Sequence, residues 1–160
     1  GYCNEGLDSG YEGDYKDEVE CIEASKAVYA ICLNESLSKH GQDIGTEQVI
    51  IENLANILIY SYVADSTLSR VIQNKDFYMK KNQIVPELCA KVYTAEQGIR
   101  VMEYANKILN NIYDGSVPEQ LNNKLEVLKK RLTLSTDTIG LKKIIGEKVI
   151  EAGGYPVKSF

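Results

Sequence analysis

Residues 50–71 read IIENLANILIYSYVADSTLSRV, and this stretch decides the fold. Apolar or small side chains recur in it at gaps of alternately four and three, at Ile50, Leu54, Ile57, Ser61, Ala64, Leu68 and Val71. This spacing puts one side of an α-helix against a neighbour, and its regularity favours a long antiparallel partner that crosses at a shallow angle. No Gly or Pro interrupts residues 46–73. The sequence therefore predicts a helix about 40 Å long, with Thr46 as its N-cap.

The partner helix is predicted to run from Pro86 to Tyr113. Pro suits a first helical turn, and a seven-residue register continues from there. The residues expected on its inner face are Leu88, Val92, Ala95, Ile99, Met102, Leu109 and Tyr113. Of these, Val92, Ile99 and Met102 should face Leu54, Ile57 and Leu68 of the first helix. Between the two long helices, residues 74–84 are polar and lack periodicity, which predicts a loop or a frayed helix end.

An earlier helix is predicted at residues 15–39 because two apolar stripes follow it at helical spacing. One holds Val19, Ile22, Tyr29, Leu33 and Leu37, and the other holds Ala24, Ala27, Val28 and Ile31. A helix that is apolar on two sides is packed on both, so this one should be central. Gly41 is expected to end it, and the His40 imidazole is expected to meet its last carbonyl groups.

Two shorter helices are predicted in the C-terminal part. Asp114 and Gly115 end the long partner helix, and Ser116 with Glu119 has the spacing of a capping box that starts the next one. Its apolar face would be Leu121, Leu125, Leu128 and Leu132. A last helix is predicted to start near Ser135 or Thr136 and to end at Gly153-Gly154, with an inner face of Leu141, Ile145, Val149 and Ala152.

These patterns predict an all-α fold, an antiparallel bundle of about five helices, two of them long. A chain of 160 residues with 44% apolar residues suits a single domain. We expect residues 1–14, which are rich in glycine and acid, to form a flexible acidic lead-in, and residues 15–160 to form the helical bundle.

Composition excludes several classes of protein. Apolar residues never run on for the length of a membrane-spanning helix. One histidine and four cysteines at gaps of 18, 11 and 57 give no zinc-binding pattern. Cys21, Cys32 and Cys89 fall inside helical patterns as small apolar residues, which favours a reducing, intracellular setting.

Charge is unevenly distributed along the chain. The net charge is −5, but the first 23 residues hold eight acids against one base, whereas residues 119–160 hold eight bases against five acids. Overall acidity argues against a nucleic-acid partner, and the basic C-terminal part is interpreted as a solvated helix face.

The sequence offers no catalytic, cofactor-binding or metal-binding residues. A single histidine cannot supply the two Glu-x-x-His motifs of a di-iron bundle, and no nucleophile elbow or phosphate-binding loop is present. Asp65 is the one acid that stands out, because it lies within an apolar helix. An ion pair with a base on another helix, a proton-transfer role and simple exposure all remain open for it.

The long helix predicted at residues 46–73 also carries a family resemblance. Its Tyr62, Ala64, Asp65, Ser66, Leu68 and Arg70 resemble the motif Y-A-x-E-S-x-x-x-R in the C-terminal extension of long acyl-CoA dehydrogenases. These are enzymes of the very-long-chain type and their bacterial relatives, of about 600 residues, a length that accommodates several domains. Weaker similarities run from Ala24 to Phe160 in the same order and spacing. Two residues depart from the family pattern, since Asn56 replaces an aspartate and Asp65 a glutamate.

The resemblance implies that this chain has no activity of its own. In that family the FAD, the acyl-CoA pocket and the catalytic glutamate belong to an upstream core of the same polypeptide, which carries out α,β-dehydrogenation of a fatty acyl-CoA. The extension packs on that core, and the long enzymes are homodimers. The resemblance also implies a cytoplasmic location in a bacterium or the mitochondrial matrix in a eukaryote, with at most weak peripheral membrane contact.

Two other functions remain open from the sequence. A free-standing helical protein-interaction module would present an apolar patch to a partner helix. A small enzyme of unfamiliar type would need a polar pocket that contains a strongly perturbed acid.

Overall fold

The computed structural model describes residues 12–157. Residues 1–11 of the predicted lead-in, and Phe160, lie outside this range. Within it, 82% of the residues are helical and no strand is present. The elements are α1 (Lys16–His40), the 3-10 helix η1 (Gly41–Thr46), α2 (Gln48–Gln73), α3 (Lys75–Lys80), α4 (Val85–Ile112), α5 (Glu119–Leu132) and α6 (Thr138–Ala152). The predicted all-α class is confirmed.

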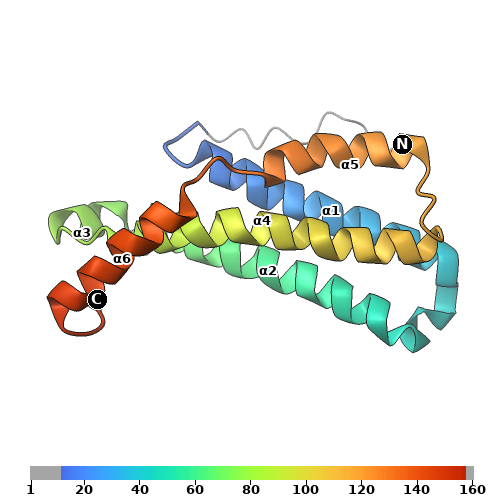
Figure 1. The fold of residues 1–160 in the computed structure, drawn as a ribbon, viewed down its shortest axis with the longest axis horizontal. Coiled ribbons are helices and arrows are strands. Elements are labelled where there is room, and N and C mark those ends of the chain that lie inside the picture. Colours follow the sequence, from blue (N-terminus) through green and yellow to red (C-terminus); the bar gives the residue numbers. More distant parts are fainter. Residues whose placement is uncertain (1–11, 158–160) are drawn as a thin grey trace.

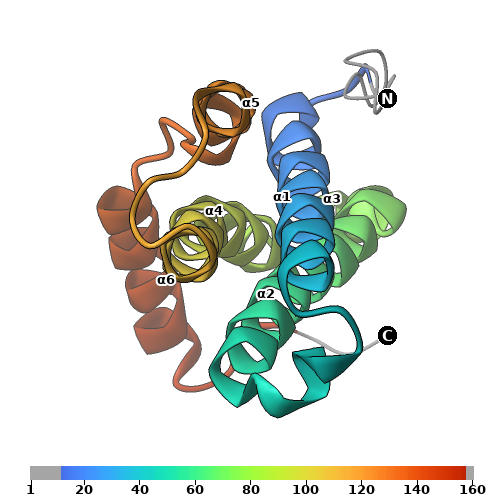
Figure 2. The same ribbon diagram turned by 90° about the vertical axis from the view of Figure 1, so that its right-hand side faces the viewer.

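Helix α4 is the centre of the bundle. It contacts α1, α2, α5 and α6, and its contacts with α2 are the most extensive between any two elements. Figure 1 shows that α1, α2 and α4 run alongside one another in alternating directions, with α5 returning above them. Seen along the bundle, α6 lies on the opposite side of α4 from α1 and α2 (Figure 2). The two long helices therefore pack antiparallel, as the heptad spacing predicted.

The inner face of α2 was predicted correctly. All seven residues of its 4-3 stripe are buried: Ile50, Leu54, Ile57, Ser61, Ala64, Leu68 and Val71. All but Ser61 belong to one of two apolar clusters, a large one formed with α1, α4 and α5, and a smaller one that includes Tyr15, Ile22 and Ala90. The flanking residues Ile51, Leu58 and Tyr62 are exposed.

The predicted inner face of α4 was partly wrong. Ile99, expected in the seam with α2, is 63% exposed, whereas Val101, Ala105 and Ile108 are almost fully buried. A helix with four neighbours buries much more than a single stripe, so a seven-residue register does not describe it. Val92 and Met102 are buried as expected.

Small side chains form the most buried side of α1. Cys21, Ser25, Cys32 and Ser36 are fully buried, while Leu37, which we expected inside, is 44% exposed. The hydroxyl of Ser25 donates to the carbonyl of Cys21 at 2.9 Å, and that of Ser36 to the carbonyl of Cys32 at 2.7 Å. These bonds satisfy the buried hydroxyls within the helix and leave α1 narrow enough for several helices to approach it.

Three predicted helix starts were wrong. Thr46 belongs to η1, where its hydroxyl donates to the carbonyl of Asp43 at 2.8 Å, so it does not cap α2. Helix α5 begins after Pro118 without a side-chain cap, so Ser116 and Glu119 form no capping box. Helix α6 begins after Asp137, whose carboxylate accepts from the amide of Gly140 at 2.9 Å.

The predicted helix ends are confirmed. Helix α1 stops at Gly41, α4 is followed by Asp114 and Gly115, and α6 stops at Gly153. Their φ angles are 56°, 49°, 80° and 64° in that order. Three of these four residues are glycines, which adopt positive φ without steric cost and therefore favour the end of a helix.

The segment between the long helices is more ordered than expected. Residues predicted as a loop or frayed end contain the short helix α3, which makes the sixth α-helix. Tyr78, in α3, is buried, and the amide of Gln83 donates to its carbonyl at 2.9 Å. One aromatic anchor in a polar segment produces no periodicity, and this explains why the pattern missed the helix.

The last two helices differ in burial. Leu125, Leu128 and Leu132 of α5 are buried, as predicted, and Leu121 is partly buried. Helix α6 has no buried residue: of its predicted inner residues, Leu141 and Ile145 are partly covered, whereas Val149 and Ala152 are exposed. It therefore lies on α4 without closing the bundle. No helix within residues 12–157 combines the length and apolarity needed to cross a membrane.

Candidate functional site

The six family-like residues of α2 lie around the helix and do not share one face. Ala64 and Leu68 are buried in the bundle, whereas Tyr62, Ser66 and Arg70 are exposed and Asp65 is half-exposed. Ala64 and Leu68 both belong to the smaller apolar cluster. The motif is therefore not gathered into a pocket, and its buried members pack in the core.

Asp65 forms an ion pair with a base on another helix, one of the three roles that the sequence left open. Its Oδ2 lies 2.9 Å from Nζ of Lys26 on α1, and the same ammonium lies 2.7 Å from Oε1 of Glu23. Burial alone would lower the pKa of Lys26, but its hydrogen bonds to Glu23 and Asp65 raise that pKa above the ordinary value. The pair joins α1 to α2 at the surface, where such contacts contribute little to stability.

A buried polar cluster joins α1 to α4. Nε2 of Gln97 lies 3.2 Å from Oγ of Ser25 and 3.5 Å from Sγ of Cys21, and Oγ1 of the neighbouring buried Thr94 has no partner within residues 12–157. Burial raises the pKa of Cys21 to about 12, and that of Cys32 likewise to about 12. Both thiols are protonated at neutral pH, and a thiol is a poor nucleophile compared with a thiolate.

The histidine does not serve either cysteine. Nδ1 of His40 lies 3.8 Å from Oε1 of Glu47, and its Nε2 is buried with no partner in the described part of the chain. It is not hydrogen-bonded to the last carbonyls of α1, so its predicted cap role was wrong. Cys32, the nearer of the two buried cysteines, is two turns away along α1, about 12 Å, so neither Cys21 nor Cys32 pairs with His40.

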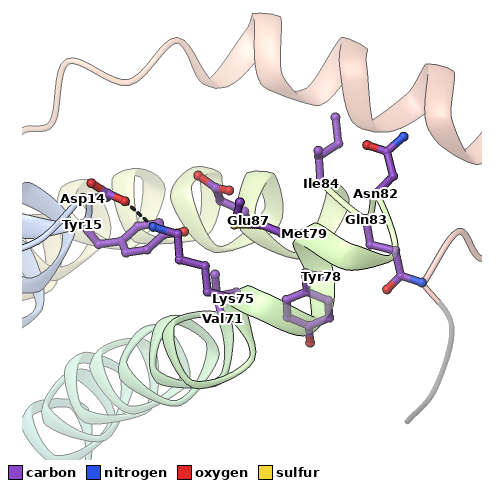
Figure 3. Close-up of a pocket in the computed structure, with 10 residues that line it drawn as sticks. All are labelled: Asp14, Tyr15, Val71, Lys75, Tyr78, Met79, Asn82, Gln83, Ile84 and Glu87. Atoms are coloured by element: carbon purple, nitrogen blue, oxygen red, sulfur yellow. Dashed lines mark hydrogen bonds and ion pairs between the residues drawn. The ribbon is translucent and has the colours of Figure 1, made fainter.

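A cavity of about 450 Å³ lies where the start of α1, the end of α2, α3 and the start of α4 meet. Figure 3 shows Lys75 joined to Asp14 beside the ring of Tyr15, with Tyr78 and Gln83 further along the wall. The ammonium groups of Lys75 and Lys91 lie 5.8 and 5.5 Å from the centre of the Tyr15 ring. Burial is the main reason why the pKa of Tyr15 is raised.

The chemistry of this cavity is limited. Its ten lining residues include no Ser, Thr, Cys or His, so they contain no Ser–His or Cys–His pair. Among residues 12–157, no group of three or more His, Cys, Asp or Glu side chains could hold a metal ion. The cavity could not be predicted from the sequence, because the walls of the cavity come from four segments that no spacing rule connects.

A stack of tyrosines on the outside of α2 and α4 was also missed. The ring of Tyr60 lies 6.4 Å from that of Tyr93 and 5.9 Å from that of Tyr104. Arg100 lies 5.9 Å from the centre of the Tyr60 ring, and Lys107 lies 5.3 Å from that of Tyr104. Such contacts between aromatic rings and cations hold the two helices in register at their outer edge.

Comparison with known families identifies the fold. Residues 25–130 match the family model described as "Acyl-CoA dehydrogenase, C-terminal domain". The chain belongs to this family. The match covers most of α1, all of α2, α3 and α4, and most of α5, so it includes all six residues of the family-like motif. No curated protein matches the chain.

Over residues 25–130 the match confirms that part of the sequence resemblance which concerns the C-terminal domain of acyl-CoA dehydrogenases. In this acyl-CoA dehydrogenase C-terminal domain, α2 and α4 make the most extensive contact between helices, and the family-like motif lies on α2. Helix α6 lies beyond the matched residues.

Proposed function

We propose that this acyl-CoA dehydrogenase C-terminal domain belongs to a long enzyme of the very-long-chain type and packs on the upstream core of the same polypeptide. The observation that carries the proposal is the family match over residues 25–130. In such a parent the core holds FAD and the acyl-CoA and performs the dehydrogenation. The present chain contributes no catalytic residue and shapes the dimeric assembly of the oxidoreductase.

The exposed side of α6 suits the contact with the core. Ile139 is 70% exposed and Ile150 is 80% exposed. They lie at either end of a 4-3-4 stripe with Lys143 and Gly146, and a Cβ on Gly146 would meet nothing within 4 Å. Two isoleucines that flank an open glycine form a surface that a neighbouring helix can approach closely.

The first test is the gene. The reading frame upstream of the codon for Gly1 should continue into a dehydrogenase core. A stop codon followed by a start codon near Gly1 would contradict the proposal and favour the free-standing interaction module, which the same exposed apolar residues would equally serve.

The second test uses the full-length parent. Replacing Ile139 and Ile150 with Glu places two carboxylates in the proposed contact, so the domain should be released faster by limited proteolysis at its junction with the core. The matched control is Val127→Glu, because Val127 is 54% exposed on α5. Equal release in both variants would place the contact elsewhere.

A further inference from the structure

The outer side of α2 is apolar over much of its length. Five exposed residues account for this: Ile51, Leu58, Ile59, Tyr62 and Val63, which are 41%, 49%, 57%, 70% and 37% exposed. Scattered exposed apolar residues are normal at protein surfaces, but several on one helix form a patch. No element within residues 12–157 covers this patch.

A second heptad seam follows this outer side. Glu52, Asn56, Ile59, Val63, Ser66 and Arg70 are spaced 4-3-4-3-4, two positions after each member of the buried stripe from Ile50 to Leu68. Two positions correspond to more than half a turn, so the seam lies on the side away from the bundle. Helix α2 thus has two sides with the spacing of helix packing, and α1 and α4 fill only the inner one.

The charges at the ends of the seam have opposite signs. Glu52 and Arg70 are 18 residues apart, which is five turns, so they lie on one line of the helix about 27 Å apart. Their midpoint coincides with the midpoint of Ile59 and Val63. When a second α2 lies antiparallel along the seam, Glu52 of each copy therefore faces Arg70 of the other. In the same way, Ile59 of each copy faces Val63 of the other. A parallel copy would instead set Glu52 against Glu52.

We propose that two copies of this chain associate through their α2 helices, antiparallel about a two-fold axis. This interface is isologous, which is the commonest arrangement in homodimers. It is independent of the proposed contact between α6 and a dehydrogenase core.

The charged residues are able to form this pairing. Glu52 is exposed and makes no ion pair with any residue in the range 12–157. Arg70 is exposed and already interacts within its own chain. Its guanidinium has five N–H donors in a fixed fork, so it is able to bind Glu52 of the other copy while it keeps that interaction.

The first experiment is sedimentation equilibrium of the full 160-residue chain over a range of concentrations. The wild-type chain should show a reversible monomer–dimer equilibrium. Ile59→Glu places an unpaired carboxylate in the seam and should raise the dimer Kd by at least about tenfold. Val127→Glu, an equally drastic change on α5 at a residue that is 54% exposed, should leave the Kd unchanged. A wild-type chain that stays monomeric, or an Ile59→Glu variant that dimerises normally, overturns the proposal.

The second experiment tests the register by charge reversal. Glu52→Arg and Arg70→Glu, each alone, set like charges together and should raise the Kd by about fivefold at low salt. The double variant restores opposite charges at both ends and should return the Kd close to that of the wild type. Circular dichroism verifies that each variant is folded. Failure of the double variant to recover, with its helical signal intact, overturns the antiparallel register.

Discussion

Gly98 on α4 faces the carbonyl oxygen of Leu132, at the end of α5, so closely that a Cβ at position 98 would lie 2.2 Å from that oxygen. The same Cβ would lie 3.1 Å from Sγ of Cys21 on α1. Three helices therefore meet at one glycine. Glycine is required here because it lacks a side chain, and not because of its backbone conformation, which is that of an ordinary α-helix.

Gly98→Ala should therefore destabilise the domain, although alanine favours helices. The added methyl group forces α4 and α5 apart, and overpacking of this kind costs about 1–3 kcal/mol. The matched control is Gly146→Ala in α6, where a Cβ meets nothing within 4 Å and the free energy of unfolding should rise by about 0.5–1 kcal/mol. Urea denaturation measures both changes. Equal responses at the two glycines would contradict the close contact.

Ile57→Ala should cost about 2–5 kcal/mol of stability, because the fully buried side chain leaves a cavity in the seam between α2 and α4. Val49→Ala, on the same helix but 70% exposed, is the control and should change the free energy of unfolding by no more than about 0.5 kcal/mol. The denaturation midpoints decide the comparison. An unchanged midpoint for Ile57→Ala would mean that the seam is incorrectly placed.

Stability should decrease at alkaline pH partly because of the buried thiols. Burial raises the pKa of Cys32 to about 12, from an ordinary value of 9.0. The unfolded thiol loses its proton first, so the contribution is complete below about pH 9 and is lost as pH rises through the folded pKa. Cys32→Ala should lose about 2 kcal/mol less than the wild type between about pH 8 and pH 11.

Cys89→Ala is the control for this pH dependence, because Cys89 is exposed. Its stability should follow the wild-type curve more closely than that of Cys32→Ala. The measurement is urea unfolding at a series of pH values. If the two variants have the same pH dependence, burial is not what holds the Cys32 thiol protonated.

Anionic vesicles should bind the chain weakly at low salt and release it near 0.15 M, where the Debye length is about 8 Å. The C-terminal helices carry Lys124, Lys129, Lys130, Arg131, Lys142, Lys143 and Lys148. Three of these bases form ion pairs with Glu126, Glu96 and Glu151, which reduces the charge available to a membrane. Co-sedimentation at increasing salt is the measurement, and retention at high salt would indicate insertion of apolar side chains.

The purified chain should contain no flavin. In the proposed parent the FAD belongs to the upstream core, and the sequence of this chain has no phosphate-binding glycine turn. The visible absorbance of the purified chain, compared with that of the full-length parent, is the measurement. Stoichiometric flavin in the isolated chain would contradict this assignment.

The buried face of a helix was predicted best where the helix has few neighbours. Helix α2 packs only on its inner side, so a single stripe described it and all seven predicted residues are buried. Helix α4 has neighbours on several sides, so its buried surface is wider than a heptad stripe describes. For this reason Ile99 was wrongly predicted to be buried. In α1 the predicted Ile22, Ala24 and Val28 are buried, but so are Ser25 and Ser36, whose small polar side chains a search for apolar residues passes over.

The candidate sites were harder to predict than the fold. The ion pair of Asp65 was one of three open alternatives, because no spacing rule places Lys26 of α1 beside it. The cavity that contains Asp14 and Lys75 depends on how four segments meet in space. Thr46 was assigned as a cap since its residue type is favourable, yet it bonds locally within η1 instead.

The contact between Cys21 and Leu132 has a consequence for synthesis of the chain. The thiol of Cys21 lies 3.8 Å from the carbonyl oxygen of Leu132, 111 residues later. During translation α1 emerges early, and α4 then covers part of Cys21, but the contact with Leu132 forms only when α5 is complete. The nascent domain therefore leaves one side of α1 open to chaperones or to misassembly until residue 132 has left the ribosome. A pause in translation between α4 and α5 would prolong that open state.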